Sequence, residues 1–180
     1  MLEKVVSLEE ILRRRAEWRE AGKRVVFTNG AFDLLHVGHL RYLQAARGLG
    51  DLLIVGLNDD ASVRTYKGPG RPLVPADERA ELLAGLECVD YVLPFGDATA
   101  TRLVEAIAPD VYVKGGDYAA GGKPLPEAEA ARAAGGEVVI VPLVAGRSTT
   151  GLIDRIRASA SRDAEALDRL GRSGRGEDAD

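Results

Sequence analysis

The chain has 180 residues, a net charge of −4, two histidines and a single cysteine, Cys88. This length suits one domain with a substantial core. The acidic balance provides no basic field for nucleic acid, and one cysteine excludes an internal disulfide framework or a multi-cysteine metal site. The longest apolar stretch, Leu52 to Leu57, is too short to cross a bilayer, and no signal-peptide pattern is present. We therefore expect a cytoplasmic protein that binds neither nucleic acid nor membrane.

The predicted elements alternate between helices and short apolar strands. Ser7 and Glu10 form a capping-box pattern that opens a first helix, and Gly22 is placed to end it. The strands are expected at Val25 to Phe27, Leu52 to Leu57, Tyr91 to Leu93, Val111 to Val113 and Val138 to Val141, and the later helices at about His39 to Leu49, Asp77 to Leu86, Thr101 to Ile107 and Pro126 to Ala134. Strands that are apolar throughout predict a Rossmann-like, doubly wound, parallel five-stranded sheet with helices on both faces.

The domain boundaries follow from the same patterns. We expect one domain over residues 1–158, with residues 1–22 forming the N-terminal helix packed on it. Residues 159–180 are expected to form a C-terminal helix extension to about Leu170 and then a disordered tail. The tail from Gly171 to Asp180 is rich in Gly, Arg and Asp and offers no apolar partner.

The carboxyl ends of the predicted strands carry the most information about function, because ligands of such sheets bind there. Glycine, hydroxyl and charged residues gather at these points. They are Thr28-Asn29-Gly30, Asn58-Asp59-Asp60, Lys114-Gly115-Gly116-Asp117 and, farther along, Arg147-Ser148-Thr149-Thr150. These residue types predict a site for an anionic ligand.

Both histidines lie in one segment, Gly30 to His39, which leaves the first strand and enters a helix. His36 and His39 are three residues apart, so at a helix start they lie on one side, near the positive end of the helix dipole. Gly38 between them allows a ligand to approach the backbone closely. Two imidazoles at a helix N-terminus predict a phosphate site whose donors stabilise charge that develops during a reaction.

The arrangement strand, G-x-F-D-x-x-H-x-G-H, helix resembles the signature of the HxGH nucleotidyltransferases. The resemblance is greatest to the adenylyltransferase domain of the bifunctional heptose-phosphate kinase/adenylyltransferases, and glycerol-phosphate cytidylyltransferases are also similar. It runs from about Glu9 to Ile156 and makes the domain over residues 1–158 a nucleotidyltransferase domain. It rests on four segments in the same order: the motif above with Thr28-Asn29 before it, Lys67 to Pro72, Lys114 to Tyr118, and Ser148 to Thr150.

The resemblance implies roles for individual residues. His36 and His39 would stabilise the α-phosphoryl group, and Lys67, in a loop after a short helix, would reach the triphosphate. Arg79 would support the site. The implied nucleotide-binding residues are Thr28, Asn29, Gly30, Phe32, Gly38, Lys114, Gly115, Asp117, Arg147, Ser148, Thr149 and Thr150.

The resemblance also implies the substrates. Ala31 stands where cytidylyltransferases carry threonine, which favours ATP. The expected reaction transfers AMP from ATP to a sugar 1-phosphate, D-glycero-β-D-manno-heptose 1-phosphate, and gives an ADP-sugar and pyrophosphate. Mg²⁺ is expected as a cofactor bound mainly through phosphates rather than in a protein cage. Because only a short helix precedes the first strand, we expect any sugar kinase to be a separate protein. A homodimer is common in the family, and the oligomeric state stays open.

Several alternatives stand beside these expectations. The same fold and histidines suit a CTP-dependent enzyme acting on glycerol 3-phosphate or another alcohol phosphate, or a non-catalytic nucleotide sensor. Asp33, His36 and His39 have a spacing that a metal ion could share, although Asp33 is expected to be a helix N-cap or a structural acceptor. Arg79 could form a surface ion pair near Glu78. Lys67 could be an ordinary solvated lysine, and the hydroxyls of residues 148–150 could simply cap a helix.

Overall fold

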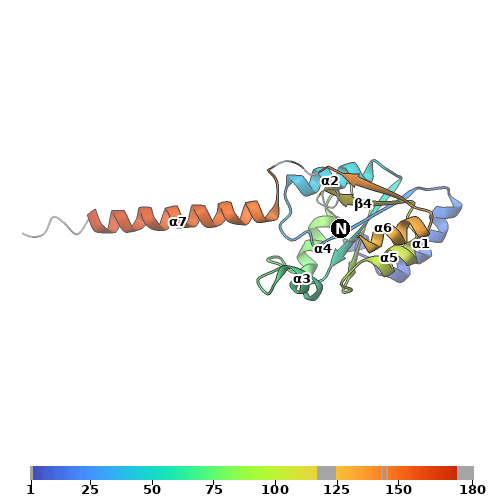
Figure 1. Ribbon diagram of the computed structural model, residues 1–180, viewed down its shortest axis with the longest axis horizontal. Helices are drawn as coiled ribbons and strands as arrows, with labels where there is room; N and C mark the ends of the chain where they lie inside the picture. The colour runs from blue at the N-terminus through green and yellow to red at the C-terminus, as the bar shows by residue number, and fades with distance from the viewer. Residues whose placement is uncertain (1, 117–124, 143, 145, 174–180) are drawn as a thin grey trace, which may run out of the picture. The chain divides into compact units, whose positions relative to one another are not determined.

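The computed structural model of the protein describes residues 2–116, 125–142, 144 and 146–173. The chain divides into two compact units, Met1–Ala145 and Gly146–Asp180. The elements are η1 (Leu2–Lys4), α1 (Leu8–Glu20), β1 (Val25–Gly30), α2 (Val37–Arg47), β2 (Leu52–Asn58), α3 (Asp60–Lys67), α4 (Ala76–Ala84), β3 (Tyr91–Phe95), α5 (Thr101–Ile107), β4 (Val111–Gly115), α6 (Pro126–Ala133), β5 (Glu137–Val141) and α7 (Thr149–Ser173) (Figure 1). The first unit thus holds the whole sheet.

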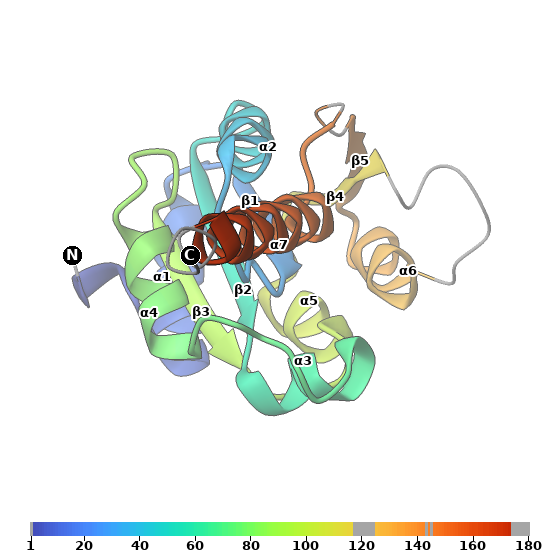
Figure 2. The ribbon, with the colours of Figure 1, turned by 90° about the vertical axis from the view of Figure 1, so that its left-hand side faces the viewer.

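The five strands form one parallel sheet in the order β3-β2-β1-β4-β5, which Figure 2 shows from one edge to the other. Thr28 lies opposite Val55 on one side and Val113 on the other, so β1, β2 and β4 end at the same edge of the sheet. The chain leaves β1 toward β2 on one side and later returns to place β4 on the other. The strand order therefore reverses between β1 and β4, which is where such sheets bind ligands.

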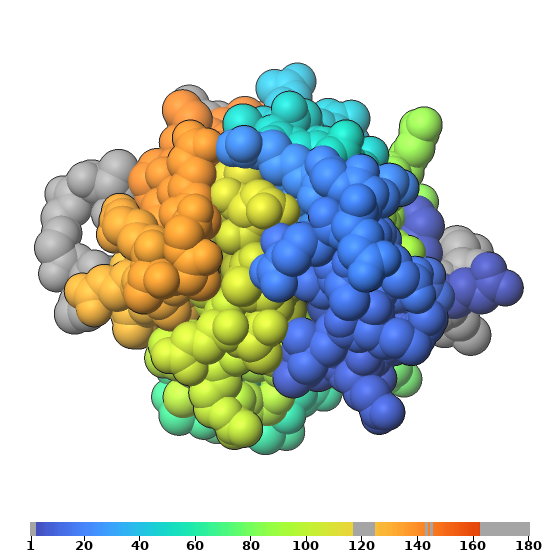
Figure 3. All heavy atoms as spheres, turned by 90° about the vertical axis from the view of Figure 1, so that its right-hand side faces the viewer, coloured from blue at the N-terminus to red at the C-terminus, as the bar shows by residue number. Residues whose placement is uncertain are grey.

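Helices cover both faces of this sheet. On one face α1, α5 and α6 pack on Val25, Phe27, Ile54 and Tyr112, and Figure 3 shows these three helices side by side. On the other face α2 and α4 pack on side chains that include Val26, Leu53, Val55, Val111 and Val113. Alternate residues of each strand thus enter opposite cores, as strand geometry requires. The predicted fold class is confirmed.

The ends of the helices differ in part from the prediction. Ser7 caps α1 as expected, since its hydroxyl accepts from the Glu10 amide at 3.2 Å. The helix after β1 begins earlier, at Val37, and its N-cap is His36. Asp33 therefore does not cap this helix, and of its two predicted roles the structural acceptor is the one confirmed. Lys67 is the last residue of α3 and the loop begins at Gly68, so its predicted place within a loop is wrong.

The second unit contains α7. The helix runs unbroken to Ser173, past the expected end at Leu170, and it includes Gly171 from the segment expected to be disordered. Residues 174–180 of the expected tail lie outside the described residues. In the described part of the chain, no helix combines the length and apolar character that a membrane crossing needs. The predicted domain boundary at residue 158 stays a prediction.

Candidate functional site

The candidate site lies at the carboxyl edge of the sheet, where β1 and β4 are neighbours. The segment after β1 enters α2 and carries both histidines. The segment after β2 begins with Asp59, whose carboxylate accepts from the Ser62 amide at 2.7 Å and caps α3. Strand ends, a helix N-terminus and a capped helix leading to Lys67 therefore meet at this edge.

The two imidazoles are stacked on each other. The ring centroids of His36 and His39 are 4.0 Å apart and their planes differ by 19°. His36 has extended backbone angles, φ −144° and ψ 171°, and its Nδ1 accepts from the Gly38 amide at 3.0 Å. With Nδ1 used as an acceptor, Nε2 carries the proton of the neutral His36 ring. The structure thus brings both predicted histidines together, and the Gly38 amide fixes the His36 ring by a hydrogen bond.

His39 is the more perturbed of the pair. Its pKa is lowered from 6.5 to about 4, first by desolvation and then by the nearby charges of His36 and Lys67, while the Leu34 carbonyl acts in the opposite direction. Its buried Nδ1 makes no hydrogen bond within the described part of the chain. At neutral pH the His39 ring is therefore uncharged. An anion bound beside the ring would raise its pKa.

The loop before α2 packs against one of these histidines. Phe32 is buried and has a φ of 44°, a left-handed conformation that is unusual for a bulky residue. Its ring packs edge-on against His39 with centroids 5.5 Å apart. A Cβ at Gly30 would meet the Phe32 ring at 3.1 Å, so a side chain there would push on this contact. Gly30 and Phe32 thus support His39 by packing.

Asp33 makes structural contacts with the loop between α3 and α4. Its Oδ1 accepts from the Leu73 and Val74 amides at 2.8 and 3.0 Å, and its Oδ2 lies 2.6 Å from Arg71 Nε. In the described ranges, no three His, Cys, Asp or Glu side chains gather as a metal cage would require. The alternative of a shared metal on Asp33 and the two histidines therefore finds no support in this geometry.

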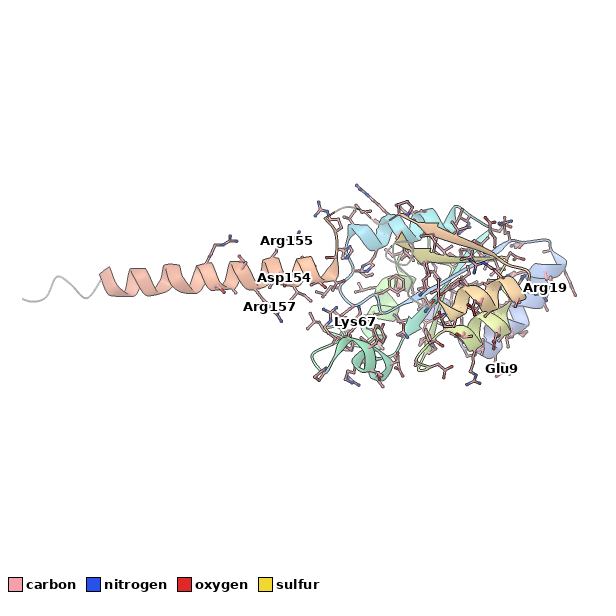
Figure 4. The ribbon with its side chains drawn as sticks, in the orientation of Figure 1. Glu9, Arg19, Lys67, Asp154, Arg155 and Arg157 are labelled. Carbon is pink, nitrogen blue, oxygen red and sulfur yellow. The ribbon has the colours of Figure 1, made fainter. Side chains whose placement is uncertain are left out.

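Lys67 ends α3 at a helix C-cap, Gly68, whose φ is 92° (Figure 4). Its Nζ lies 5.9 Å from the centroid of the Tyr66 ring. The pKa of Lys67 is lowered, first by desolvation, then by the positive charge of Arg71, with Asp33 acting in the opposite direction and Arg79 adding to the lowering. Because Lys67 in turn lowers the pKa of His39, the lysine and the histidine pair share one electrostatic environment.

Arg79 is completely buried, so the alternative of a surface ion pair near Glu78 is wrong. Its Nη2 pairs with Asp60 at 2.6 Å, and its Nε donates to the Val74 carbonyl at 2.8 Å. Its Nη1 donates to the carbonyls of Ala31 and Asn58, the latter at 2.9 Å. One guanidinium therefore joins the ends of β1 and β2 to the start of α3 and to the loop before α4.

Across the reversal point, β1 and β4 are joined by polar side chains. Tyr112 donates its hydroxyl proton to Asn29 Oδ1 at 2.8 Å, and Lys114 Nζ donates to the Asn29 carbonyl at 3.2 Å. Lys114 is buried and is the fourth residue of β4, one residue before the strand ends. Asn29, Lys114 and the strand end at Gly115 are thus adjacent, as predicted. Tyr112 was not foreseen, because its place in an apolar strand indicated only a core residue.

Thr28 differs from its predicted neighbours because its hydroxyl is used within the protein. Thr28 is fully buried, and its Oγ1 lies 2.7 Å from the Tyr42 hydroxyl, which donates to the Val113 carbonyl at 3.1 Å. With the Tyr42 proton on Val113, Thr28 is the donor in the pair. This network links β1, α2 and β4, so the geometry gives Thr28 a supporting position and not an open one.

The remaining predicted residues lie elsewhere. Asp117 lies outside the described residues. Arg147, Ser148, Thr149 and Thr150 belong to the second unit. There Ser148 Oγ accepts from the Gly151 amide at 3.0 Å, so the expected capping of this helix is found. Contact of these four residues with a nucleotide stays a prediction.

Comparison with protein families gives one match over most of the chain. A family model described as cytidylyltransferase-like matches residues 27–148, which include the histidine pair, Lys67, Arg79 and Lys114. Among curated relatives, the bifunctional protein HldE of Syntrophotalea carbinolica is 54% identical over 155 residues, which are 84% of this chain and 31% of that protein. The bifunctional protein HldE of Geobacter sulfurreducens is 51% identical over 153 residues, 85% of this chain and 31% of that protein. The chain thus spans about a third of the length of these relatives.

Two solved structures have a similar fold. The lipopolysaccharide core biosynthesis protein from Thermoplasma volcanium is 29% identical with a TM-score of 0.55, covering 68% of this chain and 98% of that one. Pantothenate synthetase from Thermus thermophilus matches with a TM-score of 0.52 at 18% identity, covering 78% of this chain and 62% of that one. The second likeness shows a common fold alone.

The low pKa of His39 can be measured directly. An NMR titration should show one imidazole with a pKa of about 4, assigned by its absence in His39→Asn and its presence in His36→Asn. Unfolded histidine titrates near 6.5, so between these two values the unfolded state binds more protons and stability falls as the pH falls. Urea unfolding at pH 7 and pH 5 should show this loss, and His39→Asn should reduce it. A His39 pKa near 6.5 would contradict the described burial.

Arg79 should dominate the stability of this edge of the sheet. Arg79→Ala removes the donor to three carbonyls and the cation that pairs with Asp60, and should lower the free energy of unfolding by about 3–5 kcal/mol. The matched control is Arg102→Ala, because Arg102 is 84% exposed and 3.8 Å from Asp97; it should cost no more than about 0.5–1 kcal/mol. Urea denaturation measures both. Equal, small effects would refute the role given to Arg79.

Proposed function

The chain belongs to the cytidylyltransferase-like family of nucleotidyltransferases, and from this premise we propose that it transfers AMP from ATP to a sugar 1-phosphate. The products are an ADP-sugar and pyrophosphate, and the proposed acceptor is D-glycero-β-D-manno-heptose 1-phosphate. The observation that supports this most is the stacked pair of His36 and His39 at the start of α2, beside the point where the strand order reverses.

The reaction needs little covalent participation by the protein. An oxygen of the acceptor phosphate attacks the α-phosphorus of ATP, a new P–O bond forms, and the bond from the α-phosphorus to the bridging oxygen of the β-phosphate breaks. Pyrophosphate leaves with that electron pair. The acceptor phosphate is already ionised at neutral pH, so no general base is required. Catalysis then comes from alignment and from stabilisation of the charge on the α-phosphoryl oxygens.

His36 and His39 are proposed to stabilise this charge. A ring that is neutral in the free protein can take up a proton when a phosphate arrives, since a nearby anion raises the pKa of an imidazole. The lowered pKa of His39 therefore leaves room for a large change on nucleotide binding. Lys67, which already acts electrostatically on His39, is proposed to hold the triphosphate as a second positive charge.

The resemblance supports the proposals for the nucleotide and its metal, and the strand ends support the place of the nucleotide. Asn29, Gly30, Gly38, Lys114 and Gly115 surround the reversal point, and we propose that they line the nucleotide pocket. From the resemblance alone, Asp117 and residues 147–150 are also proposed as nucleotide-binding residues. Mg²⁺ is the proposed cofactor, and it would supply positive charge that stabilises the phosphates of the nucleotide.

The setting of the reaction is proposed on the same basis. A protein that consumes ATP and a phosphorylated sugar is expected in the cytoplasm. It would need neither nucleic acid nor a membrane surface, in keeping with its net charge of −4. A homodimer is the oligomeric state that we propose from the resemblance to the family.

CTP is the competing nucleotide, because the matching family model is described as cytidylyltransferase-like. Two observations favour ATP. The residue that follows β1 is the buried Ala31 in place of threonine, and relatives such as the HldE protein of Geobacter sulfurreducens share about half of their residues with the chain over the matched region. An alcohol phosphate such as glycerol 3-phosphate is the matching alternative acceptor.

Replacing either histidine should remove most of the activity without unfolding the protein. His36→Ala and His39→Ala should each lower kcat by about 100- to 1,000-fold, because each removes a preorganised stabiliser of the reacting phosphate. The matched control is Arg13→Ala on α1, an exposed arginine that pairs with Glu10 and Glu17; its kcat should equal that of the wild type. Near-normal turnover in both histidine variants would defeat the assignment.

The assay itself decides among the candidate functions. Pyrophosphate release should be measured with ATP, CTP, GTP and UTP against heptose 1-phosphate, glucose 1-phosphate and glycerol 3-phosphate. The proposal expects the highest kcat/KM with ATP and heptose 1-phosphate. The highest value with CTP and glycerol 3-phosphate would establish the cytidylyltransferase alternative. Nucleotide binding without pyrophosphate from any pair would indicate a sensor.

A further inference from the structure

Asp33 makes three contacts with the loop that connects α3 to α4. Its side chain is completely buried, and its Oδ1 accepts from the Leu73 and Val74 amides at 2.8 and 3.0 Å. Its Oδ2 lies 2.6 Å from Arg71 Nε without the alignment of a hydrogen bond, so that contact is an ion pair. The two carboxylate oxygens thus make different contacts. Oδ1 accepts hydrogen bonds from backbone amides, and Oδ2 pairs with the guanidinium of Arg71.

The loop of residues 68–75 depends on such anchors. It contains two glycines and three prolines, and a Cβ added at Gly68 or Gly70 would meet no atom within 4 Å. The Cβ positions of Gly68 and Gly70 therefore face open space. In the described part of the chain, Asp33 and Arg79 hold this loop by side-chain hydrogen bonds and an ion pair, and Arg79 does so by donating to the Val74 carbonyl.

These contacts join the two halves of the candidate site. Asp33 precedes His36 by three residues, on the segment that carries the histidine pair. Arg71 follows Lys67 by four residues, on the loop that starts where Lys67 ends its helix. The Arg71 side chain is 17% exposed, so its guanidinium is largely enclosed beside the carboxylate. The ion pair therefore joins the histidine segment to the 68–75 loop that follows Lys67.

We propose that Asp33 and Arg71 are positioning residues for nucleotidyl transfer: their buried ion pair holds the 68–75 loop to the histidine segment and thereby sets the place of Lys67 relative to His36 and His39. This inference rests on the proposed function. Neither residue needs to touch the substrate. A lysine displaced by about 1 Å from its place in the transition state can cost on the order of 100-fold in rate.

Asp33→Asn removes the negative charge of the side chain and keeps its size. The amide oxygen can still accept from the Leu73 and Val74 amides, but the ion pair with Arg71 is lost. We expect kcat to fall about 10- to 100-fold, while the KM for the acceptor changes little. Arg71→Ala should give a similar loss. The double variant should be no worse than either single variant, because the two residues act as one unit. The control is Arg13→Ala, which breaks an exposed ion pair on α1.

The charge on Lys67 provides a readout that a merely structural role would not move. The groups that act on Lys67 are Arg71, Asp33 and Arg79, and Lys67 acts in turn on His39. Arg71 lowers the pKa of Lys67 and Asp33 raises it. An NMR titration of the Lys67 side chain should therefore show a lower pKa in Asp33→Asn and a higher pKa in Arg71→Ala. Simple loosening of the loop would move both values in the same direction, or neither.

The outcomes distinguish this inference from the proposed function. Wild-type protein that releases no pyrophosphate would refute the function, while the opposite shifts at Lys67 would still test the ion pair. An active wild type with both variants within twofold of its kcat would overturn the inference. If Asp33→Asn does not fold, Arg71→Lys tests the contact from its more exposed side. It keeps the charge but not the guanidinium geometry, and wild-type kcat in this variant would also overturn the inference.

Discussion

The site depends on the need to satisfy a buried positive charge. Arg79 is excluded from solvent, and a guanidinium in that position must find acceptors for its N–H groups. It finds them on three carbonyls and on Asp60, each from a different segment at the carboxyl edge of the sheet. A parallel sheet only places strand ends at a common edge. The buried guanidinium then fixes the loops that leave this edge, and with them the residues proposed to act on phosphate.

A second feature is the local balance of charge. The protein as a whole is acidic, with a net charge of −4, so its overall field does not attract anions. The candidate site concentrates Lys67, Arg71 and Arg79 near a histidine that desolvation keeps neutral. The carboxylates of Asp33 and Asp60 hold two of these cations in place. Such a site gains most from a ligand that brings several negative charges, as a nucleoside triphosphate does.

The sequence predicts the sheet and the histidine pair well, because both depend on local patterns. Runs such as Leu52 to Leu57 are apolar throughout, and a three-residue spacing at a helix start places two side chains together. Most partners of Asp33 and Arg79 could not be predicted, since they are 19 to 48 residues away in the chain. The Val74 carbonyl is the near one, five residues from Arg79. The contact of Thr28 could not be predicted either, because its hydroxyl lies against that of Tyr42, 14 residues away on α2. Its contact with a nucleotide stays a prediction.

The most direct test of the account is the structure of the protein bound to ATP with a methylene group between the α- and β-phosphates, which blocks transfer. The account predicts that the α-phosphate lies within hydrogen-bond distance of both imidazoles, 4.0 Å apart in the free protein, with Lys67 turned toward the phosphates. A triphosphate bound elsewhere, or imidazoles separated from each other and without contact to the α-phosphate, would contradict it.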